Sequence, residues 1–190
     1  MVIRRLRSTS AFKCLQIGRL ELADCPNATL VVAENSVLVG TIDGFLNWID
    51  ADSGTVTKRV PLGGYPYGTP VPSGPRLFLL VNGETAKLLA LDVGSGSVIW
   101  TQESEQEWST YRPLVVGSVI FVGNAEIGLC AFDQADGSVR WRRPVAGIPR
   151  GLRFSSDGTL YVGALSGVVQ AFALDKSDIC LLYTSDAADE

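Results

Sequence analysis

Short apolar runs that end at glycine or asparagine recur along the whole chain. They are rich in β-branched and aromatic residues, which favour strands, and they lie at residues 37–39, 77–81, 120–122 and 160–162. Tight connections follow them, such as Asp43-Gly44, in which glycine supplies the positive φ that a hairpin needs. The pattern predicts many paired strands. The strand after each tight connection, such as residues 45–49, is almost continuously apolar, which predicts burial on both of its faces.

The same landmarks recur at an almost constant step along the sequence. Asp50, Asp92 and Asp133 are 42 and 41 residues apart, and each is followed four residues later by a glycine. In the fourth copy Asp175 follows Ala173 and Leu174, as Asp92 follows Ala90 and Leu91. This would make the strand before Asp175 about two residues longer than its counterparts in the other copies. The alternative alignment places Ala173 at the position of the repeat aspartate.

Each unit of about 41 residues also has an earlier short strand, and a strand that ends in tryptophan in the second and third copies. Four strands in about 40–50 residues are typical of a β-propeller blade. The sequence therefore predicts an all-β fold: a partial β-propeller of about four blades of four-stranded antiparallel sheet, cut from a ring of seven or eight. Residues 1–27 would end a preceding blade or extend the N-terminus. The repeats are expected at about 28–68, 69–111, 112–149 and 150–179.

Residues 90–100 and 131–141 share the form A-x-D-x-x-x-G-x-x-x-W. This form resembles the tryptophan-docking repeat of the PQQ-like (quinoprotein alcohol dehydrogenase-like) β-propellers, over roughly residues 30–175. The first copy departs from it, with Trp48 in place of alanine and Lys58 in place of tryptophan. A WD40 propeller fits less well, because the Gly-His dipeptide and the Trp-Asp ending are both absent from the sequence.

The resemblance implies that the recurring residues lock one blade to the next and are scaffold, not an active site. This structural set is Asp50, Gly54, Asp92, Gly96, Trp100, Asp133, Gly137, Trp141 and Asp175.

Residues 180–190, CLLYTSDAADE, resemble the translated read-through of a sequencing adapter. We expect this segment to be an artefact tail outside the fold, with the natural coding sequence cut at Ile179, as in a metagenomic fragment. Three of the acids behind the net charge of −4 lie there, which leaves a nearly neutral body. Such a body gives no electrostatic case for nucleic acid. The absence of an 18-residue apolar run predicts no membrane span.

The sequence has no histidine, which excludes Ser-His-Asp catalysis and His-ligated zinc. Its four cysteines form no CxxC pair, so neither a zinc ribbon nor a thioredoxin motif is supported. Cys14 and Cys25 could pair in an oxidising compartment or remain free thiols. The family resemblance implies a periplasmic or extracellular protein, although no signal peptide is recognised in this chain.

The quinone-dependent members of this superfamily carry a vicinal Cys-Cys disulfide and hold Ca²⁺ with Glu, Asn and Asp. No adjacent cysteines occur here. Glu84, Asn124 and Glu126 lie in predicted turns and are either cation ligands or solvated loop residues.

The segment at residues 63–68 is an unusual predicted loop, in which Tyr65 and Tyr67 are framed by glycine and proline. With Trp108, which follows the acidic segment 103–107, these residues form a candidate interaction loop. The alternative is that they are connectors between blades whose rings pack inside the protein.

Two classes of function follow from these features. The first is a non-enzymatic propeller that binds a partner protein and, in this fragment, the missing blades of its own ring, with no cofactor in this chain. The second is a fragment of a PQQ- and Ca²⁺-dependent dehydrogenase, or a propeller appended to another enzyme. Because a fold alone does not define an activity, the sequence leaves both classes open.

Overall fold

A computed structural model describes residues 18–174 and has fifteen strands in that range, arranged in four antiparallel sheets whose strand order follows the sequence. The first sheet comprises β1 (Val31–Ala33), β2 (Ser36–Thr41), β3 (Phe45–Asp50) and β4 (Val56–Pro61). The second comprises β5 (Tyr65–Ser73), β6 (Arg76–Asn82), β7 (Ala86–Asp92) and β8 (Val98–Ser104). The third comprises β9 (Leu114–Val116), β10 (Val119–Asn124), β11 (Gly128–Asp133) and β12 (Val139–Arg143). The fourth comprises β13 (Pro149–Phe154), β14 (Thr159–Ala164) and β15 (Val169–Ala173).

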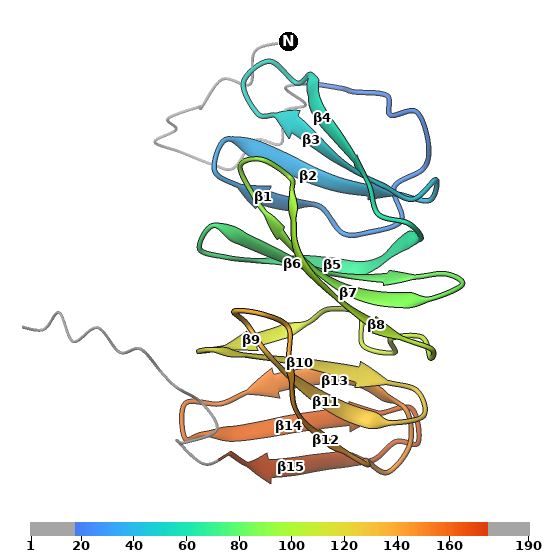
Figure 1. Cartoon of the computed structure of the whole chain (residues 1–190), viewed down its shortest axis with the longest axis vertical. Helices are drawn as coiled ribbons and strands as arrows, with labels where there is room; N and C mark the ends of the chain where they lie inside the picture. Colours follow the sequence, from blue (N-terminus) through green and yellow to red (C-terminus); the bar gives the residue numbers. More distant parts are fainter. Residues whose placement is uncertain (1–17, 175–190) are drawn as a thin grey trace, which may run out of the picture.

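The four sheets are blades stacked one on the next along the long axis of the molecule (Figure 1). The first strands of successive blades, β1, β5, β9 and β13, lie beside one another along what we call the inner edge. Backbone contacts join this edge: Ala28 forms a parallel bridge with Gly68, and the Thr69 N–H donates to the Tyr111 carbonyl at 2.6 Å. The predicted all-β partial propeller is therefore confirmed.

Three apolar cores fill the spaces between the blades. β6 contributes to two of them, because its side chains alternate: Leu77 and Leu79 pack toward the first blade, and Phe78 and Leu80 toward the third. All four of these side chains are at most 2% exposed. Burial on both faces explains why the central strands have nearly continuous apolar sequences.

The fourth blade corrects the expected position of the repeat aspartate. Thr159 pairs with Ala173, just as Arg76 pairs with Asp92 in the second blade. The β14–β15 hairpin thus places Ala173, not Asp175, at the aspartate position. Asp175 lies outside the described residues, as do the expected artefact tail and Cys14.

The segment around Tyr65 and Tyr67 is not a loop, as expected from its glycines and prolines, but part of strand β5. The pairing of β5 with β6 is interrupted between Tyr67 and Val71, and Pro70 lies in this irregular stretch, where no regular ladder bond is required. Gly68 lies there too, with φ +75°. A Cβ atom at this position would be 1.7 Å from the Tyr111 carbonyl oxygen. Glycine is therefore needed where the second and third blades meet.

Candidate functional site: the blade joints and the inner edge

The repeated aspartates close the turns after β3, β7 and β11. The carboxylates of Asp50 and Asp92 each accept the backbone N–H of the residue three positions later, at 2.7 Å. Asp133 accepts the Ala135 N–H at the same distance. These hydrogen bonds lower the pKa of all three carboxyl groups, because they stabilise the charged form. For Asp133 the larger cause is its hydrogen bond with Arg140.

Each of these turns ends at the repeat glycine. In the third blade, the tryptophan of the second blade packs on this glycine. Gly137 has φ +76°, and a Cβ atom there would be 2.6 Å from the Trp100 ring. The Trp100 indole N–H donates to the Gln134 carbonyl of the same turn at 3.2 Å. Trp100 and the Asp-to-Gly turn therefore form one joint between the second and third blades.

The first joint has the same geometry with its tryptophan on a different strand. The Trp48 indole N–H donates to the Val93 carbonyl at 2.8 Å, and the Trp48 ring lies against Gly96. Trp48 is on β3, directly opposite Lys58, whereas Trp100 is on the outer strand β8, opposite Ala90. In the first blade, tryptophan thus occupies the third-strand position that holds Ala90 in the second blade, and Lys58 occupies the fourth-strand position that holds Trp100. The departure of the first copy from the repeat is thus an alternative way to build the same joint.

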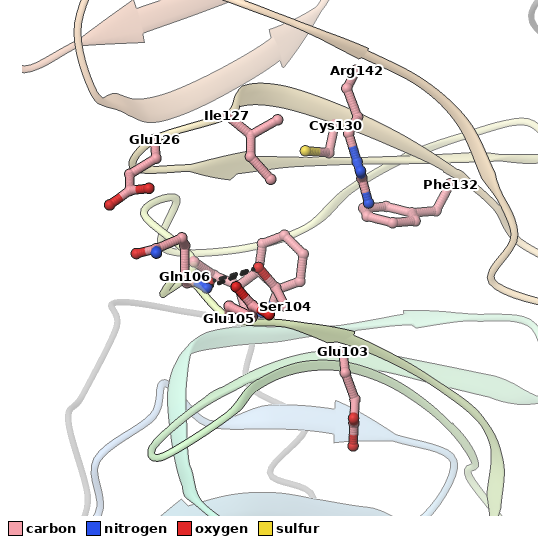
Figure 2. Close-up of a pocket in the computed structure, with 10 residues that line it drawn as sticks. Glu103, Ser104, Glu105, Gln106, Glu126, Ile127, Cys130, Phe132 and Arg142 are labelled. Atoms are coloured by element: carbon pink, nitrogen blue, oxygen red, sulfur yellow. Dashed lines mark hydrogen bonds between the residues drawn. The ribbon is translucent and has the colours of Figure 1, made fainter.

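A cleft of about 400 Å³ lies between the second and third blades and contains Cys130, which is 1% exposed (Figure 2). Burial raises the pKa of the Cys130 thiol to about 11, so the unreactive thiol form dominates at neutral pH. At one side of the cleft the Ser104 hydroxyl donates to the Gln106 carbonyl at 2.8 Å and accepts the Gln106 N–H at 3.2 Å (Figure 2). Glu103 points away from the other labelled side chains.

The candidate cation ligands are either hydrogen-bonded to the backbone or exposed to solvent. The side-chain oxygen Oδ1 of Asn124 already accepts the backbone N–H groups of Glu126 and Ile127, at 3.1 and 3.0 Å. The Glu84 and Glu126 side chains are exposed. Among residues 18–174, no group of three or more His, Cys, Asp or Glu side chains could hold a metal ion.

The inner edge brings together aromatic and charged side chains from three blades. Tyr67 stacks on Tyr111 with their ring centroids 5.7 Å apart, and Arg150 donates to the Tyr67 hydroxyl at 2.9 Å. Tyr65 is 36% exposed and donates to Glu107 at 3.0 Å. Trp108, the third member of the expected interaction loop, is only 3% exposed, which corrects its expected surface position. It packs in the core between the second and third blades, so only the tyrosines of that set are available to a partner.

The four-stranded blades and the tryptophan joints define the class: this is a PQQ-like β-propeller. The family model described as outer membrane protein assembly factor BamB matches residues 16–179, and the chain belongs to this family. A curated relative, the 1-butanol dehydrogenase (cytochrome c) of Thauera butanivorans, is 30% identical over 83 residues, which are 43% of this chain and 12% of the dehydrogenase.

Solved structures share the fold. BamB from Moraxella catarrhalis matches with a TM-score of 0.64 and 23% identity over 79% of this chain and 47% of its own. The computationally designed Ika4 protein matches with a TM-score of 0.69 and 15% identity over 82% of this chain and 94% of its own. The chain thus spans about half of BamB and about an eighth of the dehydrogenase.

Proposed function

We propose that this protein is a non-enzymatic PQQ-like β-propeller that binds a partner protein, as an interaction or assembly scaffold. The observation that carries the proposal is the match to the assembly-factor family over residues 16–179. In this proposal the recurring Asp, Gly and Trp residues are scaffold that joins the blades. In the same proposal the chain binds no cofactor, and its location is periplasmic or extracellular, which is compatible with a family described as an outer membrane protein assembly factor. Within residues 18–174, no helix is long and apolar enough to cross a membrane.

The inner edge is the surface that best suits a partner. It presents Tyr111, which is 57% exposed, beside the guanidinium of Arg150. Tyrosine and arginine are enriched where proteins bind one another, because they combine a large apolar area with hydrogen-bonding groups. The structural role of the Asp-to-Gly turns does not require this surface, which leaves it available for recognition.

The second candidate is a PQQ- and Ca²⁺-dependent dehydrogenase whose site lies outside the described residues. The local 30% identity to a butanol dehydrogenase favours it. A propeller appended to another enzyme belongs to the same alternative. The dehydrogenase would need oxygen ligands for Ca²⁺ that converge on one point.

Two measurements on the full-length protein separate these candidates. A photoreactive phenylalanine analogue at position 111 is expected to yield one discrete polypeptide adduct in cells. The same analogue at the exposed position 101, on the outer strand β8, is expected to yield none. Equal labelling from both positions, or none from position 111, contradicts the scaffold. Alcohol-dependent dye reduction after addition of PQQ and Ca²⁺ would overturn it in favour of the dehydrogenase.

A further inference from the structure

The inner edge holds a partly buried positive charge that lacks a negative partner. Arg150 lies in β13, at the start of the fourth blade. Within residues 18–174, no carboxylate oxygen forms an ion pair with its guanidinium. Its Nε atom is buried and has no hydrogen-bond partner. Proteins normally pair a charge withdrawn from water, so this guanidinium has the capacity to bind an anion.

Three blades hold the guanidinium in place. One Nη atom donates to the Tyr67 hydroxyl at 2.9 Å and, more weakly, to the Ser109 carbonyl at 3.3 Å. The guanidinium carbon lies 5.4 Å from the centre of the Tyr111 ring, within reach of a cation–π interaction. The arginine is therefore positioned by the fold before any ligand arrives, which lowers the entropy cost of binding.

Arg150 and Tyr67 both have hydrogen-bond donors that are left over. The Tyr67 hydroxyl accepts from Arg150, so its own proton remains to be donated. Burial raises the pKa of Tyr67, which keeps the hydroxyl protonated at neutral pH. The nearby carboxylate of Glu107 accepts a hydrogen bond from Tyr65. A group of donors around one cation suits a small anion.

Tyr111 defines what lies beside that anion. Tyr111 is 57% exposed, and its ring stacks on Tyr67 with an interplanar angle of 28°. A flat, accessible aromatic face next to a guanidinium favours a ligand with an apolar or aromatic group next to its negative charge.

We propose that Arg150, Tyr67 and Tyr111 form a binding site for a carboxylate that is attached to an apolar or aromatic group. A planar carboxylate matches the fork of a guanidinium and can accept the tyrosine proton as well. Two sources share this chemistry: a free aromatic acid, and the C-terminal carboxylate of a polypeptide. The site does not depend on the scaffold function, because a dehydrogenase could also carry it.

Calorimetric titration of the full-length protein with benzoate tests the proposal, with benzamide as the neutral probe of the same shape. Benzoate is expected to bind saturably with a dissociation constant below about 50 mM, and benzamide to bind at least about tenfold more weakly. Arg150→Gln should weaken benzoate binding by about tenfold or more, and Tyr67→Phe by about three- to tenfold. Arg153→Gln is the matched control, because Arg153 is an exposed arginine of the same strand. Circular dichroism confirms that each variant is folded.

The source of the carboxylate is tested with a peptide that ends in phenylalanine, compared with the same peptide amidated at its C-terminus. Tighter binding of the free peptide than of benzoate assigns the site to a polypeptide terminus, and the reverse order assigns it to a small acid. The proposal is overturned if neither benzoate nor the peptide binds, if benzamide binds equally well, or if Arg150→Gln and Arg153→Gln have the same effect. Photocrosslinking at position 111 can succeed or fail separately, so this result and that of the scaffold proposal are distinguishable.

Discussion

The Trp48 indole N–H donates a 2.8 Å hydrogen bond to the Val93 carbonyl across the joint between the first and second blades. The equivalent bond at the next joint runs from Trp100 to Gln134 at 3.2 Å. The two tryptophans come from different strands, yet each donates to the residue that follows the repeat aspartate. The joint therefore depends on where the indole lies, not on which strand supplies it.

Trp48→Phe keeps an aromatic ring at the first joint but removes the N–H donor. The Val93 carbonyl then loses its side-chain donor in a buried site, because Trp48 is 3% exposed. We expect the free energy of unfolding to fall by about 1–3 kcal/mol, measured by urea denaturation. A stability equal to that of the natural protein would mean that the bond contributes nothing to the joint.

Gly137→Ala tests the close approach of Trp100. The new Cβ atom would lie 2.6 Å from the indole ring, and the alanine would have to adopt φ +76°. Strain and overpacking together should lower the free energy of unfolding by about 2–4 kcal/mol. The control is Gly167→Ala, at φ +80° with no neighbouring atom within 4 Å, where only the strain of about 1–2 kcal/mol applies. Equal losses in the two variants would contradict a tight joint.

Asp133→Asn tests the charge of the third turn, because asparagine retains an oxygen for the Ala135 N–H. Arg140 donates to the Asp133 carboxylate at 2.6 Å, and this bond is the main reason why its pKa lies below the usual value. Stability from a lowered carboxyl pKa is fully present above the unfolded-state value of about 3.9 and is lost as pH falls through the native value. The natural protein should therefore exceed the variant by up to about 1 kcal/mol at pH 7, since the pair is partly exposed.

This difference in unfolding free energy should shrink as the pH falls below about 4. In an Arg140→Gln background the same substitution should have a smaller effect, because only the Ala135 N–H then favours the charged carboxylate. A difference that stays constant from pH 7 to strongly acidic pH would show that the ion pair does not stabilise the turn.

Much of the fold was predictable because its signals are local. Residues 90–100 and 131–141 repeat one turn chemistry, and their spacing defines a blade. The fourth blade was harder to place, since the aspartate position holds Ala173 and only the pairing with Thr159 reveals it. The sequence shows that Trp48 and Lys58 both depart from the repeat. Only the pairing of β3 with β4 shows that they are neighbours.

The inner-edge cluster was only partly predictable. The glycines and prolines around Tyr65 and Tyr67 mark this segment as unusual, but they predict a loop where the structure has strand β5. The sequence gives no reason to single out Arg150, because it lies 83 residues from Tyr67 and no local pattern connects them. Contacts of this kind arise when the blades stack, so the sequence around each residue does not encode them.

The central claim is that the recurring tryptophan joins the blades by docking on the Asp-to-Gly turn. The most direct test moves Trp48 to the position where the repeat normally has it, by comparing Trp48→Ala with the double variant Trp48→Ala/Lys58→Trp in urea denaturation. The single variant should lose about 3–5 kcal/mol of unfolding free energy, because a buried ring is removed. The double variant should recover at least about half of that loss, because its geometry is that of Ala90 and Trp100. A double variant no more stable than Trp48→Ala would contradict the claim.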